Sequence, residues 1–471
     1  MNNMVVTLTL FALAFAPQTT TFTGEWLLTW DQNGSQFIPV SVTQEGAAAR
    51  VTWENESLLC TLTNNVCEGA VTENDNPAAG KVKITINGDE IKGEGADLEG
   101  AFTFTGKRRP APPAGGPETH KFEPTVFYNY FASNIPPALH IFPGDTVETK
   151  SVDAGGIDEN GVRRAPGGNP LTGPFYVEGA WPGDTLVVHL KRLRLNRGTA
   201  GSGTGIVPSA LGPGYFRDLK MDEHFSGEWT LDTDHGVARP AKPSEHMKDY
   251  TVPLKPMLGC IGVAPPQQQS FRSGYLGPWG GNMDYREFGE GVTLYFGVNH
   301  PGALLFLGDG HAAQGAGELT GDALETSMEF SFSVDLIKGK GLNMPRAENA
   351  EYRMASGIAN SLPEALQQAT TNLSQWLADD YKLTSNEIAL VLTDLVMPGG
   401  VSGRDLALAL RREQAGLKII YTSGYSPDIA GKDFPLQEGV NFLPKPFNPT
   451  DLAHLVRRTL DKPARADENK L

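Results

Sequence analysis

The sequence has no surplus of basic residues and no long apolar segment. Its 39 Lys and Arg are outnumbered by 55 Asp and Glu, which gives a net charge of −16. Because a chain of this charge repels phosphates, the composition argues against a nucleic-acid partner. No apolar window is long enough for a membrane-spanning helix, so we expect no integral membrane segment beyond a possible export signal.

The sequence also lacks the motifs of a serine hydrolase and of a phosphate-binding loop, and it has few cysteines. No serine lies in a Gly-x-Ser-x-Gly elbow, so a serine hydrolase mechanism has little support. The glycine-rich stretch 196–212 lacks the Gly-Lys-Ser/Thr ending of a phosphate-binding loop. Of three cysteines, Cys60 and Cys67 have a spacing that suits a local disulfide in an oxidising compartment, and two free thiols are the alternative.

What the chain does contain is typical of a globular protein with several β-rich domains. Its 471 residues exceed one ordinary domain, so we expect two or three. The 54 glycines, the 34 prolines and many short strand patterns favour a mainly β or α+β architecture.

The two ends of the chain differ from the rest. Residues 1–16 are apolar and end in Ala14-Phe15-Ala16, which is typical of a signal cleavage site. The segment is short and has no Lys or Arg, so a plain apolar first strand is the alternative. We expect a periplasmic or secreted protein, with a cytoplasmic location as the alternative. Residues 462–471 form a polar tail.

The first part of the chain predicts a small antiparallel β domain over residues 21–107. Strand patterns rich in β-branched and aromatic residues recur at 24–30, 48–53, 81–86 and 100–106. These strands suggest a small barrel or sandwich without a catalytic set of its own. Residues 108–116, with the sequence RRPAPPAGG, are a linker and mark the clearest boundary in the chain.

Residues 280–325 combine many acid/base side chains with many glycines. An apolar run at 303–307 leads directly into Gly308-Asp309-Gly310-His311, as expected of polar ligands at the end of a buried strand. Alternate strand residues share a face, so Asp309 and His311 should point to the same side.

The motifs of this stretch and of the preceding residues resemble the acetamidase/formamidase family of amide hydrolases. They occur in family order, at 143–146, 151–156, 172–175, 179–186, 256–265, 280–284, 301–304 and 308–325. The resemblance covers residues 117–388. It implies hydrolysis of the C–N bond of a small linear amide with release of ammonia. We expect a β-sandwich-like core with a C-terminal helical region, in which Ser361 begins a helix, and a homo-oligomer.

Amide hydrolysis at neutral pH needs a strong nucleophile and a polarised carbonyl, and a divalent metal such as zinc supplies both. We assign as metal ligands Asp309, His311, Asp284 and Asp153. The residues assigned to catalysis are His311, Glu318, Asp284 and Glu325, with Glu318 or Glu325 as general base. Substrate binding is assigned to Asn282, Gln314, Gly280 and Gly281.

Other interpretations of these residues stay open. The acids could cap turns and pair with Arg286 or Arg346 instead of binding a metal. Cys260 could act as a thiol nucleophile with His311 as base, although its apolar context favours an inert buried thiol. The family usually has Asp where this chain has Ala316. A catalytically impaired binding or sensor protein is therefore the alternative function.

After about residue 388 the pattern changes to one that resembles part of a response-regulator receiver domain, over residues 389–461. By this resemblance Asp394 would accept a phosphoryl group, Thr422 would be the switch hydroxyl and Lys445 the phosphate contact. The acidic pair that binds Mg²⁺ in a receiver is missing, because Asp379 and Asp380 end a helix and do not follow a strand. We therefore expect a truncated, partial α/β segment that is not phosphorylated.

Overall fold

The computed structural model describes residues 21–31, 35–74, 76–96, 100–214, 227–383, 390–394, 418–423, 437, 440–444 and 449–461. The chain divides into two compact units, Met1–Asn343 and Met344–Leu471. The expected signal-like segment at 1–16 and the tail at 462–471 lie outside the described residues.

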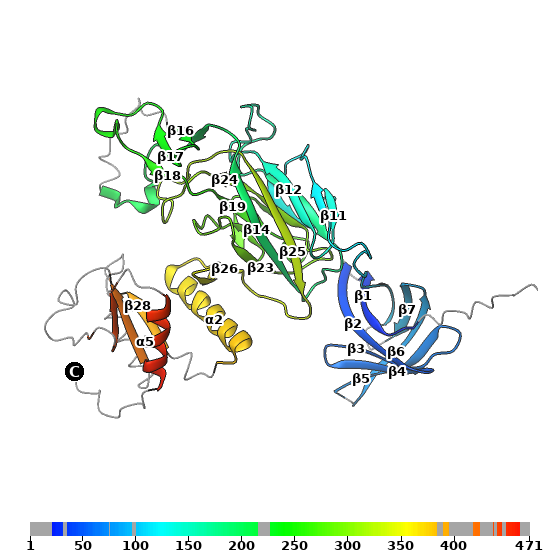
Figure 1. Cartoon of the computed structure of the whole chain (residues 1–471). Helices are drawn as coiled ribbons and strands as arrows, with labels where there is room; N and C mark the ends of the chain where they lie inside the picture. The colour runs from blue at the N-terminus through cyan, green and yellow to red at the C-terminus, as the bar shows by residue number, and fades with distance from the viewer. Residues whose placement is uncertain are drawn as a thin grey trace, which may run out of the picture. The chain divides into compact units, whose positions relative to one another are not determined.

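The first unit begins with a closed eight-stranded antiparallel barrel (Figure 1). Its strands are β1 (Gly24–Asp31), β2 (Ser35–Glu45), β3 (Ala48–Trp53), β4 (Glu56–Thr61), β5 (Val66–Glu73), β6 (Asn76–Asn87), β7 (Glu90–Ala96) and β8 (Ala101–Arg108). Each strand pairs with the next, and β1 closes the barrel by pairing with β8. Alternate residues point inward, and the core contains fully buried Trp26, Leu58 and Ile91.

A disulfide joins two neighbouring strands of the barrel. Cys60 on β4 and Cys67 on β5 are bonded, with their Cα atoms 5.4 Å apart. The expected pairing of these cysteines is confirmed, and Cys260 is the free, buried thiol.

The rest of the first unit is built on two large sheets. One has the order β11-β13-β24-β19-β22-β21, and the other contains β23-β14-β25-β12-β9. The strands of the first are β11 (Leu139–Ile141), β13 (Leu171–Val177), β24 (Leu305–His311), β19 (Met257–Gly262), β22 (Gly280–Asn282) and β21 (Leu276–Gly277). Those of the second are β23 (Thr293–Gly297), β14 (Thr185–Leu195), β25 (Met328–Ile337), β12 (Thr146–Ser151) and β9 (Thr119–Lys121).

The two sheets pack face to face, as expected of a sandwich. Phe175 on β13 meets Phe332 on β25 edge to face, with ring centroids 5.1 Å apart. Every residue of β24 is buried, because this strand lies inside its sheet between β13 and β19. Smaller pairings complete the unit. They are the four-stranded sheet β15 (Thr199–Gly201), β16 (Glu228–Asp232), β17 (Val237–Pro240) and β18 (Val252–Pro253), and the pair β10 (Tyr130–Ala132) with β20 (Ser270–Arg272).

The second unit contains a hairpin, β26 (Arg346–Glu348) with β27 (Arg353–Ala355), followed by helix α2 (Leu362–Tyr381). Ser361 caps this helix as expected, since its side chain accepts the N–H of Glu364. The acidic pair Asp379 and Asp380 lies in the last turn of α2, as the sequence indicated.

Farther along, β28 (Leu390–Asp394), β29 (Lys418–Ser423) and β30 (Phe442–Pro444) form a parallel sheet beside α5 (Pro449–Asp461). The parallel order agrees with the receiver-like resemblance, and Asp394 is paired in register with Thr422. Lys445 lies outside the described residues. Within the described part of the chain, none of the helices is long and apolar enough to cross a membrane.

Candidate metal and catalytic centre

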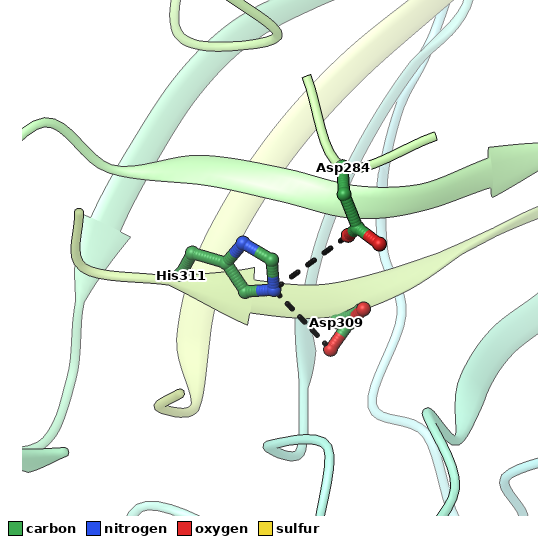
Figure 2. A group of neighbouring side chains, drawn as sticks. All are labelled: Asp284, Asp309 and His311. Carbon is green, nitrogen blue, oxygen red and sulfur yellow. Dashed lines mark ion pairs between the residues drawn. The ribbon is translucent and has the colours of Figure 1, made fainter. Parts of the chain in front are cut away.

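The end of β24 carries the residues that the sequence placed at the centre of the site. Asp309 and His311 are 2% and 1% exposed, and both side chains point to the same side, as alternation predicted. Asp284, from the loop after β22, approaches the same imidazole (Figure 2). The Nε2 atom of His311 lies 3.5 Å from Oδ1 of Asp309 and 4.0 Å from Oδ1 of Asp284.

Two further acids reach the same histidine from the following loop. Oε1 of Glu325 lies 3.3 Å from Nε2 of His311. Two groups of three side chains, Asp284-Asp309-His311 and His311-Glu318-Glu325, each bring their ligand atoms within 4.8 Å of one another. The five residues that these groups contain are called the histidine–carboxylate centre below.

Gln314 fixes the orientation of the imidazole. Its Nε2 donates to the backbone carbonyl of Asp284 at 2.5 Å, which turns its Oε1 toward Nδ1 of His311 at 3.1 Å. Since an amide oxygen only accepts, Nδ1 of His311 carries a proton and donates it. The other ring nitrogen, Nε2, faces carboxylate oxygens and therefore needs either a proton or a cation.

The electrostatics of the centre favour such a positive charge. The pKa of Asp284 is raised to about 8, first by burial and then by the charge of Asp309. Burial also raises the pKa of Glu325 to about 7, together with Asp309. For His311, burial lowers the pKa, but the carboxylates of Asp309 and Glu325 outweigh it and raise the pKa well above its usual value. These carboxylates lie so close together that they cannot all be ionised unless a positive charge lies between them.

The space and the free donor atoms fit a divalent cation. Among the described residues, Asp284 Oδ1, Asp309 Oδ1 and Glu325 Oε2 are buried oxygens without a hydrogen-bond partner. Oxygen and imidazole ligands suit several divalent metals, including zinc. Gly259 on β19 leaves the space open, because a Cβ atom there would lie 2.5 Å from Asp284 Oδ1 and 2.8 Å from both Asp309 Oδ2 and His311 Cε1.

The backbone around the centre is unusual as well. Asn169, Asp284, Asp309 and Glu318 have φ values of 57°, 38°, 60° and 43°. Non-glycine residues rarely adopt this left-handed conformation, which costs on the order of 1–3 kcal/mol each and gathers at functional sites. The fold therefore holds these side chains where a relaxed strand or turn would not.

Asp153, predicted as a metal ligand, does not join the centre. Its Oδ2 is 2.6 Å from the guanidinium of Arg197, and its Oδ1 accepts the N–H of Ile157. The prediction was wrong because a buried carboxylate beside an arginine and a turn amide already has its partners.

The four residues assigned to substrate binding have other contacts. Gly280 and Gly281 are buried in β22, where a Cβ atom would collide with the carbonyls of Ile261 and Tyr275. They allow close backbone packing, and their assignment to substrate binding stays a prediction. The side-chain amides of Asn282 and Gln314 both donate hydrogen bonds to Asp284. Substrate binding by these two residues stays a prediction.

Among the residues that the structure describes, the acids of the centre form no ion pair with Arg286 or Arg346, the alternative partners suggested by the sequence. Arg286 lies 3.5 Å from Glu287, and Arg346 donates to Asn372 within the second unit. Cys260 is fully buried, and burial, followed by the charges of Asp309 and Asp284, raises the pKa of its thiol well above the usual value. This environment favours an inert thiol, not a nucleophile.

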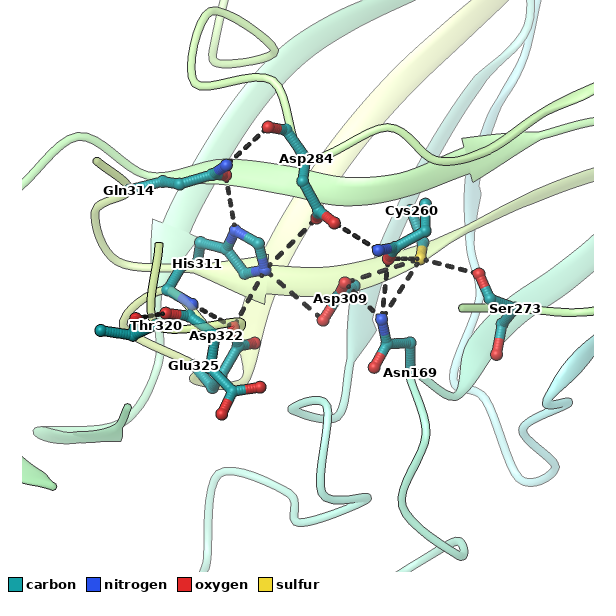
Figure 3. A network of polar contacts seen from close by, with 12 residues as sticks. Asn169, Cys260, Ser273, Asp284, Asp309, His311, Gln314, Thr320, Asp322 and Glu325 are labelled. Carbon is teal, nitrogen blue, oxygen red and sulfur yellow. Dashed lines mark hydrogen bonds and ion pairs between the residues drawn. The ribbon is translucent and has the colours of Figure 1, made fainter. Parts of the chain in front are cut away.

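Sequence reasoning missed two residues of the site. Asn169 donates to Asp309 across 140 positions of the chain (Figure 3). Gly259 lies on β19, within the Pro256–Pro265 motif, but nothing in that motif shows what its missing side chain faces. The one available signal for Asn169 was its place between two glycines and Pro170, just before the motif at 172–175.

The fold and the site define a β-sandwich protein with a buried histidine–carboxylate centre. The model of the Acetamidase/Formamidase family matches residues 118–272 and 278–377, which is more than half of the chain. The chain belongs to this family, and the resemblance stated from its motifs is confirmed.

Individual relatives are more distant. The acetamidase of Mycolicibacterium smegmatis is 27% identical over 279 residues, covering 45% of this chain and 66% of that protein. A putative formamidase of Schizosaccharomyces pombe is 24% identical over 277 residues, covering 46% and 65%. The chain thus spans slightly less than two thirds of the length of these curated relatives. A stretch of 76 residues is 37% identical to the sensor kinase CckA of Brucella abortus, covering 16% of this chain and 8% of the kinase.

Two solved acetamidase structures are similar to this chain. An acetamidase from Yersinia enterocolitica is 29% identical with a TM-score of 0.48, covering 58% of this chain and 84% of that chain. An acetamidase from Bacillus halodurans is 27% identical with a TM-score of 0.45, covering 55% and 85%.

Proposed function

We propose that this protein hydrolyses the C–N bond of small linear amides of the formamide or acetamide type and releases ammonia, with a divalent metal, preferably zinc, in the histidine–carboxylate centre. One observation carries the proposal: Nε2 of buried His311 faces Oδ1 of Asp309 and Oδ1 of Asp284, two carboxylate oxygens that have no hydrogen-bond partner. Membership of the family supports the amide substrate.

Four of the five residues of the centre have a role in this mechanism. Asp284, Asp309 and His311 would hold the metal, which supplies a Lewis acid and lowers the pKa of bound water to about 7. Glu325 is the general base of the proposal, because Oε1 accepts the N–H of Ala323 at 2.8 Å while Oε2 has no partner and can take a proton. Glu325 then returns this proton to the departing nitrogen, so that water and amide give carboxylic acid and ammonia.

The alternative is a binding or sensor protein without turnover. Ala316, where the family usually has Asp, is exposed in the turn between Gly315 and Gly317. If the missing carboxylate takes part in the reaction, the centre would bind its metal but hydrolyse amides slowly.

The test is the metal content of the purified protein together with ammonia release from formamide and acetamide. The proposal expects one metal per chain and turnover in the wild type, both lost in His311→Ala. His189→Ala is the matched control, because His189 pairs with Asp335 and Thr293 on the surface of β14. No metal and no ammonia from any small amide would refute the proposal. Metal without turnover would favour the binding protein, and Ala316→Asp would show whether that position is the cause.

We also propose export to an oxidising compartment. The disulfide between Cys60 and Cys67 supports this location, because such bonds are rare in the cytosol. N-terminal sequencing of the secreted or periplasmic fraction would test it, and a full-length cytosolic product with free Cys60 would contradict it.

A further inference from the structure

The two aspartates of the histidine–carboxylate centre use their oxygens in the same way. In each, Oδ2 accepts a hydrogen bond from a side-chain amide: Asn169 donates to Asp309 at 3.0 Å, and Asn282 donates to Asp284. In each, Oδ1 has no hydrogen-bond partner and faces Nε2 of His311. Within each aspartate, Oδ1 and Oδ2 would be equivalent in water. Here the amide occupies Oδ2 and leaves Oδ1 free to bind a cation.

Asn169 is connected to both amide contacts, and Figure 3 shows its own bond to Asp309. Its Nδ2 group has two hydrogens, and besides Asp309 it reaches Oδ1 of Asn282 at 2.7 Å and, more distantly, Sγ of Cys260 at 3.8 Å. Because the bond from Asn169, together with one from Sγ of Cys260 at 2.8 Å, holds the carbonyl side of Asn282, the Nδ2 side of the same amide is turned toward Asp284. Asn169 thus reaches Asp309 directly and Asp284 through Asn282.

We propose that Asn169 is a positioning residue that holds Oδ2 of Asp309, and through Asn282 Oδ2 of Asp284, so that both Oδ1 atoms stay directed at the metal position beside His311. A carboxylate without such a partner rotates about its last torsion and loses part of its affinity for a cation. This inference rests on the proposed function, because it assumes that the centre binds a divalent metal.

The position of Asn169 does not depend on its own side chain. The preceding loop is held by Asn129, whose Nδ2 donates to the carbonyls of Gly167 at 3.3 Å and Gly168 at 2.8 Å. Ser273 donates to the carbonyl of Gly168 at 2.6 Å. The backbone φ of Asn169 is 57°, a conformation that glycine adopts without strain. Asn169→Gly should therefore remove the amide and leave the loop in place.

The experiment is a zinc titration of the metal-stripped full-length protein, in competition with a chelator of known affinity. We expect the wild type to bind one zinc per chain and Asn169→Gly to bind it about 10- to 100-fold more weakly. Asn129→Ala is the matched control, since it removes an asparagine that contacts the same loop, through the carbonyls of Gly167 and Gly168, but does not donate to the aspartates. It should lower the melting temperature and leave the zinc affinity unchanged.

Each outcome decides between the proposals. Zinc affinity of Asn169→Gly within twofold of the wild type would refute the positioning role and leave the proposed function intact. Equal weakening by Asn129→Ala would assign the effect to the loop and also refute it. A wild type that takes up no zinc would overturn both proposals. If Asn169→Gly does not fold, Asn282→Ala serves instead: it breaks only the arm to Asp284, and an unchanged affinity would contradict the relay.

Discussion

The barrel and the histidine–carboxylate centre use their interiors in opposite ways. The barrel core is a cluster of apolar side chains, and the buried indole N–H of Trp26 donates to the carbonyl of Phe22 at 3.1 Å. The centre gathers five ionisable side chains, of which Asp309 and His311 are buried and the other three are partly buried, and it leaves three of their oxygens without a hydrogen-bond partner. Burying polar atoms without partners is unfavourable by a few kcal/mol each. The barrel interior thus contributes to stability alone. The centre gives up some stability, because its unpartnered carboxylate oxygens remain available to bind a ligand.

The largest effect should come from closing the space that the centre keeps open. Gly259→Ala places a methyl group against the side chains of Asp284, Asp309 and His311. These side chains must move, because the methyl group would lie closer to their atoms than van der Waals contact allows. Amide hydrolysis should fall by at least about four orders of magnitude, since a metal contributes both several kcal/mol of charge stabilisation and the nucleophile. Ammonia release and metal content measure this loss.

The control for Gly259→Ala is Gly315→Ala, because a Cβ atom at Gly315 meets nothing within 4 Å. This variant should keep full metal content and turnover. Equal activity of Gly259→Ala and the wild type would show that the open space beside the aspartates has no role.

A core deletion in the barrel should have the reverse signature. Trp26→Ala removes a fully buried side chain and should lower the stability of the barrel by about 3–5 kcal/mol. Because the barrel contributes no residue to the centre, zinc content and turnover should persist. Hydrogen exchange resolved by peptide would locate the loss between Gly24 and Arg108. Loss of turnover in step with barrel unfolding would contradict this independence.

Metal addition should stabilise only the region of the centre. Zinc at 100 times its dissociation constant should add about 2.7 kcal/mol to the free energy of unfolding, because it binds the folded state. Hydrogen exchange should slow in peptides that contain β24 and β19 and stay unchanged in the barrel. Equal protection of barrel peptides would mean that zinc binds elsewhere or acts on the whole chain.

The smallest effect is expected from the disulfide. Replacing Cys60 and Cys67 together by serine opens a short loop and should lower barrel stability by about 2 kcal/mol. Chemical denaturation with and without a reducing agent measures the change. The reductant should destabilise the wild type and not the double variant, and an equal reductant effect on both would show that the bond between Cys60 and Cys67 is not the cause.

The parts of the fold and of the site that depend on interactions between residues close in sequence could be predicted from the sequence. The apolar run before Gly308 predicted the buried strand β24, and alternation correctly placed Asp309 and His311 on one side of it. Ser361 predicted the start of α2 for the same reason, since a helix cap is a local hydrogen bond. The strands of the barrel were expected, but its closure by β1 and β8 is a long-range pairing.

Long-range contacts account for the errors. Asp153 was assigned to the metal because its partner Arg197 lies 44 positions away and sequence spacing gives no hint of the pair. Asn169 was overlooked because its contact with Asp309 forms only when the loop before β13 folds over β24. The close packing of Gly280 and Gly281 against the carbonyls of Ile261 and Tyr275 was not foreseen either, because it forms between segments that are not adjacent in sequence.

The left-handed backbone of the centre has a consequence for protein engineering. Asn169, Asp284, Asp309 and Glu318 stand at positions that glycine, asparagine and aspartate accept most readily and β-branched residues reject. A library that randomises these four codons would therefore lose most of its members to misfolding before any selection for a new substrate. Variation aimed at altered specificity is better directed to neighbouring positions whose backbone is relaxed.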